Sequence, residues 1–228
     1  CASIVDLNFC EENKIIAQYL HATILEDIFE ILPNVRLIYL SSDSVFNGRC
    51  GLYREEDSPE PLNWYSRTKF FGEKILQTRF KDHTILRFNV VGTNPSRNNT
   101  LSDWAYTNLS QDKSIQGFSD VIFNPLHKKQ IGLLIKLIID NHIYGVIHAG
   151  SSIPISKFDF LKRFALLLGF DTELISEVHY SDSVHFKTLT RPLNTSLLLS
   201  PFLEEICFDT SYESMMNYLI QDYLSLTI

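Results

Sequence analysis

Glycine is scarce in this sequence and comes late. Nine glycines occur in 228 residues, and the first of them is Gly48. The segment before it therefore contains no glycine-rich turn of the kind that lets backbone N–H groups surround a phosphate. Methionine is equally late and occurs only at Met215 and Met216. From these absences we expect the chain to begin inside a domain.

The sequence also has few cysteines, no long apolar run and no long basic run. Its four cysteines include no Cys-x-x-Cys pair, so we expect neither zinc nor disulfides and predict a cytoplasmic protein. No apolar stretch approaches the ~20 residues of a membrane span, and no signal peptide is recognisable. A net charge of −7 argues against nucleic acid and anionic membranes as partners. The histidines show no metal-ligand spacing, and His148 is expected to be packed and hydrogen-bonded.

Apolar residues are abundant and periodic, which predicts a globular protein of alternating helices and strands. The hydrophobic content is 45%. The helix that begins at Trp64 should turn Phe71, Ile75 and Leu76 inward. Ser156 should cap another helix, which should end at Gly169. The spacing predicts helices over residues 11–33, 64–80, 100–111, 127–143, 156–170 and 211–226, and buried strands over residues 35–42, 83–92 and 144–152.

This order of elements favours a parallel sheet with helices on both faces. In such sheets, ligands bind beyond the carboxyl ends of the strands. The run "LIYLSSDSVFNG" places Ser41 and Ser42 at one such end, and residues 89–92 lie at the next. We therefore expect a ligand site at these positions.

A tyrosine and a lysine follow this strand on one predicted helix. Tyr65 and Lys69 are four residues apart, so both side chains can face the same cleft. A lysine close to a phenol favours the phenolate and lowers the tyrosine pKa, which suits proton transfer to a carbonyl oxygen. Ser42 could hold the same oxygen, and a cofactor would have to supply the hydride. Because chance alone supplies roughly 0.5 Tyr-x-x-x-Lys matches in such a chain, a helix start with a solvated lysine is the alternative.

The segment "LIYLSSDSVFNG…YREEDSPEPLNWYSRTKFFGEKIL" resembles the central part of the extended short-chain dehydrogenase/reductases. Within them it is most similar to the dTDP-4-dehydrorhamnose reductase-like, sugar-nucleotide-binding family. The start "CASIVDLNFCEEN", the run "GVIHAGSSIPISKFDFLKRFALLLG" and the late "TRPLNTSLL" extend the resemblance over nearly the whole chain. The matching positions of the central segment are Ser41, Ser42, Asp43, Val45, Phe46, Gly48, Tyr53, Glu55 or Glu56, Asp57, Pro61, Asn63, Tyr65, Lys69, Gly72 and Glu73.

The resemblance implies an α/β fold, a Rossmann-like doubly wound parallel sheet that is N-terminally incomplete, with a small C-terminal substrate-binding subdomain. Residues 1–95 would be the C-terminal part of the dinucleotide-binding domain. Residues 96–228 would form the substrate-binding subdomain and return a strand and a helix to the sheet. The implied function is NADP(H)-dependent reduction of a 4-keto sugar nucleotide, as in dTDP-rhamnose and polysaccharide biosynthesis. The implied class is an oxidoreductase.

Carried over position by position, the resemblance implies three sets of site residues. Ser42 would orient the keto oxygen, Tyr65 would protonate it, and Lys69 would hold the nicotinamide ribose and lower the Tyr65 pKa. The cofactor, NADP or NAD, would be contacted by Tyr65, Lys69, Ala2, Ser3, Ser41, Asn89 and Val90. The nucleotide-sugar substrate would be contacted by Ser44, Phe46 and Arg191.

The sequence departs from the family pattern at several places. Ser44 replaces a tyrosine on the substrate side, Ser66 replaces the glycine after the catalytic tyrosine, and His21 stands where asparagine is usual. The glycine-rich turn that binds the cofactor diphosphate is missing from this sequence. We therefore expect either a preceding N-terminal part or a degenerate enzyme.

A second function of a different class fits the same resemblance. The regulatory subunit of methionine adenosyltransferase is similar to this family and shares the "YREED" and "PLN" stretches. A non-catalytic binding subunit is therefore the alternative to the reductase. The chain is expected to be able to form a homodimer.

Overall fold

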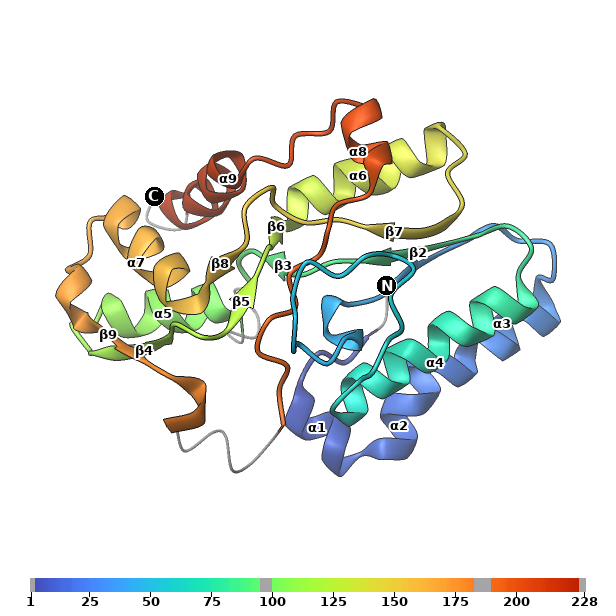
Figure 1. Ribbon diagram of the computed structural model, residues 1–228, viewed down its shortest axis with the longest axis horizontal. Helices are drawn as coiled ribbons and strands as arrows, with labels where there is room; N and C mark the ends of the chain where they lie inside the picture. The colour runs from blue at the N-terminus through green and yellow to red at the C-terminus, as the bar shows by residue number, and fades with distance from the viewer. Residues whose placement is uncertain (1–2, 95–99, 183–189, 226–228) are drawn as a thin grey trace.

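Three parallel strands form the sheet that positions the site. The computed structural model describes residues 3–94, 100–182 and 190–225 (Figure 1). The strands lie in the order β1 (Leu37–Leu40), β2 (His83–Arg87) and β7 (Gly145–His148). They pair in parallel along their whole length, so their carboxyl ends meet at one edge of the sheet.

Helices cover both faces of this sheet, because neighbouring residues of a strand point to opposite sides. Ile85 packs in a cluster with side chains of α3 (Ile24–Ile31) and α4 (Trp64–Arg79). The next residue, Leu86, packs instead with side chains of α6 (Lys128–Asp140). The predicted parallel sheet with helices on two faces is confirmed.

The N-terminal helical segment is interrupted, although the apolar spacing predicted one helix over residues 11–33. Helix α1 (Leu7–Glu12) ends at Asn13, whose ψ of 54° leaves the helical region, and α2 (Lys14–Gln18) follows. A π-helical turn (Tyr19–Thr23) then joins α2 to α3. The apolar residues keep their helical spacing across both interruptions, so the spacing could not reveal them.

Gly72 allows α4 to pack closely against this π-helical turn. A Cβ atom at Gly72 would collide with the carbonyl oxygen of His21 and with the hydroxyl of Tyr39. The Tyr39 hydroxyl donates to the same carbonyl oxygen at 2.7 Å. The close approach brings the His21 ring to the start of α4.

The inward face of α4 is not the apolar one that the spacing predicted. Phe71 is 42% exposed, whereas Leu76 is fully buried as predicted. The buried residues of α4 are mostly polar or small: Ser66, Thr68, Lys69, Gly72, Glu73 and Leu76. The helix therefore meets the sheet through polar side chains, and each of these needs a partner.

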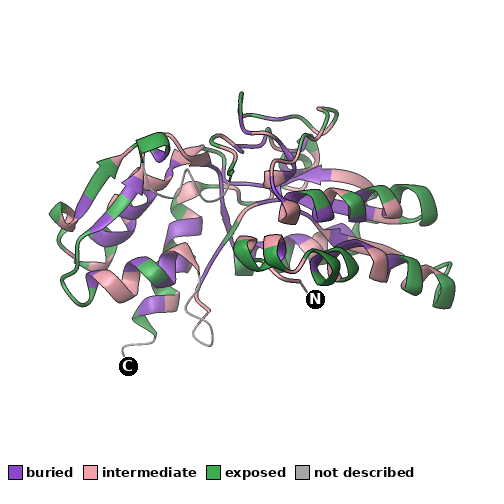
Figure 2. Ribbon diagram, turned by 90° about the horizontal axis from the view of Figure 1, so that it is seen from below, coloured by how far each residue is buried: buried purple, intermediate pink, exposed green. Residues whose placement is uncertain are grey.

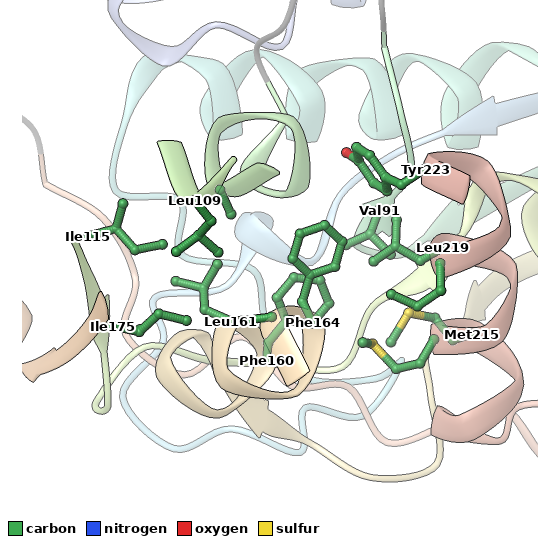
Figure 3. Packing of buried hydrophobic residues seen from close by; sticks show 14 of the residues in the cluster. Val91, Leu109, Ile115, Phe160, Leu161, Phe164, Ile175, Met215, Leu219 and Tyr223 are labelled. Atoms are coloured by element: carbon green, nitrogen blue, oxygen red, sulfur yellow. The ribbon is translucent and has the colours of Figure 1, made fainter. Parts of the chain in front are cut away.

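The elements that follow residue 96 are divided between the sheet and a second lobe (Figure 2). Strand β7 and helix α6 return to the sheet. The second lobe contains α5 (Leu101–Leu109), α7 (Lys157–Leu168) and α9 (Tyr212–Leu224), together with the parallel pair β4 (Ile115–Phe118) and β9 (Ile175–Val178). Its core, drawn in Figure 3, includes Val91, Leu109, Ile115, Phe160, Leu161, Phe164, Ile175, Met215, Leu219 and Tyr223.

Short elements connect the lobe to the sheet. Strand β3 (Val90–Val91) pairs in parallel with β6 (Leu126–His127), and β5 (Ile122–Phe123) pairs antiparallel with β8 (Ile155–Ser156). Helix α8 (Pro201–Glu205) packs beside α6. Within the described residues, 3₁₀ turns cover Asp43–Val45, Thr172–Leu174 and Tyr180–Asp182. A helix of sufficient length and apolarity to cross a bilayer does not occur within the described ranges.

Helix α7 begins and ends where the sequence predicts. The Ser156 hydroxyl oxygen accepts a hydrogen bond from the backbone N–H of Asp159 at 2.9 Å. Gly169 follows the last turn with a φ of 78°, a conformation that glycine adopts without strain.

Candidate active site

Ser42 stands where β1 gives way to the 3₁₀ turn of residues 43–45. Its backbone is extended, and its Oγ accepts a hydrogen bond from the N–H of Ser44 at 3.2 Å. A serine suits this cap position because its oxygen replaces the backbone partner that the first turn lacks. The cap holds the Ser42 hydroxyl, which is nearly buried, at the carboxyl end of the strand.

Tyr65 lies in the first turn of α4, and the Ser42 hydroxyl acts on the pKa of its phenol. Asn63 sets the start of the helix by accepting a bond from the N–H of Ser66 at 3.0 Å. Burial raises the pKa of the Tyr65 phenol to about 12, while the Ser42 hydroxyl acts in the opposite direction. The predicted lowering of this pKa is therefore wrong for the structure, because loss of water around the phenolate dominates.

Lys69 follows one helical turn after Tyr65 and is only 6% exposed. Its Nζ donates to the carbonyl oxygen of Leu40 at 2.9 Å and lies 5.1 Å from the centroid of the Tyr39 ring. Burial lowers the Lys69 pKa to about 8, although the nearby Glu73 acts to raise it. A solvated lysine, which was the alternative for this motif, is excluded by this burial.

A buried ion pair lies directly behind these residues. Glu73 of α4 accepts bonds from Arg87 of β2, at 3.0 Å from Nε and 2.7 Å from Nη2. Ser41, predicted to contact the cofactor, donates its hydroxyl proton to the Glu73 carboxylate at 2.5 Å. Because three elements meet at this carboxylate, it fixes the position of α4 over the ends of β1 and β2.

His148 extends the same network at the end of β7. Its Nδ1 lies 3.0 Å from the carbonyl oxygen of Tyr53, which can only accept, so this nitrogen carries the proton. Its Nε2 then accepts from Arg87 Nη1 at 3.2 Å. Burial lowers the His148 pKa to about 4, and the adjacent guanidinium lowers it further. A packed, hydrogen-bonded His148 is therefore confirmed.

Asp43 is a second buried carboxylate beside the site. It accepts bonds from Ser42 Oγ at 3.0 Å, from Asn89 Nδ2 at 3.0 Å and from Thr195 Oγ1 at 2.5 Å. Burial raises the Asp43 pKa, and these bonds oppose the rise. Asn89 is thus oriented by Asp43 at the end of β2, while its neighbour Val90 is 50% exposed. Both lie at the edge where the cofactor contacts were predicted.

His21 is the residue that the sequence singled out without giving it a role. Its Nε2 accepts from the N–H of Ile4 at 3.2 Å, so the proton resides on Nδ1, which lies 2.8 Å from Thr68 Oγ1. The Thr68 hydroxyl donates in turn to the carbonyl oxygen of Tyr65. Burial lowers the His21 pKa to about 4, and the charge of Lys69 contributes. The ring stands edge-on to Tyr65, with centroids 5.6 Å apart.

The remaining predicted contacts are distributed around this centre. Ser44 is half-buried and bonded to Ser42, and the Ser3 hydroxyl is buried. Arg191 is exposed and lines a cavity of about 260 Å³ with residues 5–8. Ala2 lies outside the described residues.

Phe46 does not reach any surface. Its ring is 0% exposed and stacks on Tyr53 with centroids 4.3 Å apart, below the Arg87 guanidinium. The predicted substrate contact of this side chain is therefore replaced by a packing role, because neighbours enclose the ring on all sides.

The sequence matches the RmlD substrate binding domain family over residues 1–225. The chain belongs to this family. Among related proteins, the probable low-salt glycan biosynthesis reductase Agl14 of Haloferax volcanii is 26% identical over 188 residues, 80% of this chain and 63% of that protein. Methionine adenosyltransferase 2 subunit beta of Bos taurus is 35% identical over 136 residues, 54% of this chain and 39% of that protein.

The RmlD-type fold is also evident from solved structures. The dTDP-4-dehydrorhamnose reductase of Bacillus anthracis in complex with NADP superposes with a TM-score of 0.86 and 20% identity, covering 97% of this chain and 79% of that one. This likeness establishes the predicted Rossmann-like α/β fold. The chain spans less than two thirds of the length of the two relatives named above.

Proposed function

We propose that the full-length protein is an NADP(H)-dependent reductase of a 4-keto sugar nucleotide, in which Tyr65 donates the proton. One observation carries the proposal: the Ser42 hydroxyl at the end of β1 acts on the pKa of the Tyr65 phenol, and buried Lys69 lies one turn further along α4. The names of the relatives support it, because they include a glycan biosynthesis reductase and a dTDP-4-dehydrorhamnose reductase with NADP.

The described residues fit the nicotinamide end of such a cofactor. The Ser3 Oγ is buried without a hydrogen-bond partner in the part of the chain that the structure describes. Burying a hydroxyl in this way is costly unless a ligand or a water supplies the partner. The Lys69 ammonium uses one donor on Leu40 and has two more. Ser3 and Lys69 would therefore hold the cofactor, with Asn89 and Val90 beside them.

Each proposed catalytic side chain is in the state that carbonyl reduction needs. The hydride for the carbonyl carbon would come from the nicotinamide of the cofactor that Ser3 and Lys69 would hold. Tyr65, with a pKa of about 12, keeps its proton at neutral pH and can give it to the keto oxygen. The Ser42 hydroxyl can donate to the same oxygen. The positive charge of Lys69 would stabilise the phenolate that remains.

The proposal is tested by offering dTDP-4-keto-6-deoxyhexoses to the full-length protein and following NADPH oxidation by absorbance. We expect Tyr65→Phe to lower kcat by about 10²- to 10⁴-fold, because the acid is removed while the ring remains. Tyr144→Phe is the matched control, because Tyr144 is exposed and lies before β7, away from the strand ends. Wild-type turnover by Tyr65→Phe would contradict the assignment.

A second candidate function is a non-catalytic subunit. The observation that favours it is the 35% identity to methionine adenosyltransferase 2 subunit beta. Co-purification with a partner enzyme, together with no NADPH oxidation on any keto sugar, would support this function over the reductase.

The proposal extends to the assembly and location of the protein. Neighbouring helices expose apolar side chains that suit a homodimer interface: Ile15, Ile16, Tyr19 and Phe71. A nucleotide-sugar reductase of this kind would work in the cytoplasm, where we place the protein.

A further inference from the structure

His21 makes one hydrogen bond with each ring nitrogen, and the two bonds reach different parts of the site. Its Nε2 accepts from the backbone N–H of Ile4 at 3.2 Å. Its Nδ1, which then carries the proton, donates to Thr68 Oγ1 at 2.8 Å. The histidine is only 1% exposed. The ring therefore bridges the N-terminal segment and helix α4.

The bond to Ile4 holds the segment that is proposed to contact the cofactor. Ile4 directly follows Ser3, whose Oγ is buried without a hydrogen-bond partner among the described residues. We call residues 3–4 the cofactor segment. Without the Nε2 acceptor, the N–H of Ile4 would need another partner, and the backbone of the cofactor segment could shift.

The bond to Thr68 holds the start of α4, where the proposed proton donor lies. The Thr68 hydroxyl donates to the carbonyl oxygen of Tyr65 at 2.8 Å, so it accepts from His21. The two rings of His21 and Tyr65 also stand edge-on, with centroids 5.6 Å apart and planes at 90°. Because such a contact favours one orientation of the phenol ring, His21 acts on both the backbone and the ring of Tyr65.

The backbone of His21 is fixed as well. It belongs to the π-helical turn of residues 19–23, and such turns are frequent at functional sites. The Tyr39 hydroxyl donates to the carbonyl oxygen of His21 at 2.7 Å and to that of Lys69 at 3.3 Å. Burial and the charge of Lys69 keep the ring neutral, so Nε2 can accept. A buried histidine with a purely structural role is the alternative.

We propose that His21 is a positioning residue that holds the cofactor segment in place against the proton donor Tyr65. The inference rests on the proposed reduction, in which the cofactor and the phenol must face the same carbonyl group. Hydride and proton reach neighbouring atoms, so a shift of one group by about 1 Å should slow the reaction strongly. His21 takes no part in either transfer and sets the distance between the two groups.

Two amide side chains can separate the two bonds. The amide nitrogen of asparagine is attached to Cγ, as Nδ1 is, and can still donate to Thr68. The amide oxygen of glutamine lies one atom further out, as Nε2 does, and can still accept from Ile4. His21→Asn therefore keeps the bond to α4, His21→Gln keeps the bond to the cofactor segment, and His21→Leu keeps neither.

The three variants are compared in the full-length protein, at a temperature where all are folded, by NADPH binding and by NADPH oxidation on dTDP-4-keto-6-deoxyhexoses. We expect His21→Gln to lower kcat about tenfold and to keep the Kd for NADPH within about twofold of wild type. We expect His21→Asn to raise this Kd about three- to tenfold and to lower kcat less than about threefold. His21→Leu should show both losses.

Thr84→Val is the matched control for the loss of one buried hydrogen bond. The Thr84 hydroxyl is buried near the amino end of β2, away from the site, and donates to the carbonyl oxygen of Ile143 at 2.6 Å. Its removal should lower the free energy of unfolding and leave both kcat and the Kd for NADPH unchanged.

Hydrogen exchange of the Ile4 amide provides a readout that needs neither NADPH nor turnover. We expect this exchange to be at least about fivefold faster in His21→Asn and His21→Leu than in wild type. In His21→Gln it should be unchanged, because the acceptor is kept.

The outcomes separate the positioning role from a structural one and from the proposed function. The inference is overturned if His21→Asn and His21→Gln lose kcat and NADPH affinity in the same proportion, or if His21→Leu keeps wild-type values of both. A wild-type protein that binds NADPH and oxidises it on no keto sugar refutes the reductase. The NADPH affinities and the amide exchange of the variants then decide whether His21 holds the cofactor segment. A wild-type protein that does not bind NADPH refutes both.

Discussion

Helix α4 in the sheet half and helix α7 in the second lobe are both buried on one face, but they bury different chemistry. The inner face of α4 carries Ser66, Lys69 and Glu73, each with a named hydrogen-bond partner. The inner face of α7 carries Phe160 and Phe164, which belong to an apolar cluster with α5 and α9 (Figure 3). Helix α4 is therefore held by hydrogen bonds with fixed directions, whereas helix α7 is held by the burial of apolar surface.

The difference separates stability from positioning. Apolar burial contributes about 25 cal/mol per Å² and depends little on orientation. A buried polar side chain costs free energy unless its partners are in place, so its partners fix it in one arrangement. The sheet half therefore holds the proposed catalytic groups of α4 in place, while the lobe is stabilised by apolar burial.

The largest effect that we expect comes from removing the central carboxylate. Glu73→Gln leaves the Arg87 guanidinium buried without its counter-charge, which should lower the free energy of unfolding by about 3–5 kcal/mol. It also replaces one of the two acceptor oxygens shared by Ser41 and Arg87 with an NH₂ donor, so the ends of β1 and α4 should shift relative to each other. Urea unfolding measures the first effect, and NADPH oxidation at low temperature measures the second.

Phe164→Ala is the matched substitution in the lobe. Phe164 is fully buried, and its truncation should also cost about 3–5 kcal/mol through a cavity. Under conditions where both variants are folded, Phe164→Ala should keep a wild-type kcat and Glu73→Gln should not. Equal losses of kcat in the two variants would mean that the polar face of α4 has no special role in positioning.

The same contrast explains what the sequence could predict. Helix α7 was predicted with both caps, because its apolar face, Ser156 and Gly169 all act within a few residues. The strand end at Ser42 was predicted because parallel strands present their carboxyl ends to ligands. The inward face of α4 was partly mispredicted, with Phe71 exposed, because apolar periodicity does not register a buried face made of polar residues.

Contacts between distant segments could not be predicted at all. The bond from Thr195 to Asp43 joins residues 152 positions apart. The place of His21 depends on a π-helical turn and on the missing Cβ of Gly72, neither of which leaves a signal in local spacing. The departure at position 21 was visible in the sequence, but its role required the neighbouring helix.

Acid should weaken the sheet half through its buried neutral histidines. The His21 pKa is about 4 in the folded protein, whereas it is about 6.5 when the chain is unfolded. Between these values the unfolded chain binds more protons, so stability falls as pH decreases from 6.5 toward 4. From pH 7 to pH 5, the free energy of unfolding should fall by about 2 kcal/mol less in His21→Asn than in the wild type. Urea unfolding at each pH measures this difference.

His142→Asn is the control for this substitution, because His142 is exposed after α6. Hydrogen exchange in β1 and β2 should accelerate at pH 5 before exchange in α7. A pH dependence that His21→Asn does not alter would show that the ring is not kept neutral by its surroundings.

The smallest effect concerns the contact that joins the two halves. Asp222 of α9 accepts bonds from His127 Nε2 at 3.0 Å and Thr93 Oγ1 at 3.1 Å, and it pairs with Lys128 at 2.7 Å. Burial would raise the Asp222 pKa, but the bonds from Lys128 and His127 outweigh it and hold this pKa well below its usual range. The contribution of Asp222 is therefore complete above about pH 4 and is lost as pH falls further.

Asp222→Asn should lower the free energy of unfolding by about 1–2 kcal/mol at pH 7, because His127 is fully buried and keeps only a neutral partner. Lys128 is half-exposed and can be hydrated when its partner charge is removed, which limits the loss of stability. The difference from wild type should shrink as the pH approaches 2. Asp140→Asn, in an exposed pair with Lys136, should change stability by less than about 0.5 kcal/mol. Equal losses of unfolding free energy in Asp222→Asn and Asp140→Asn would show that apolar contacts alone join the sheet half to the lobe. The hydrogen bonds that fix the sheet half would then not extend to the lobe.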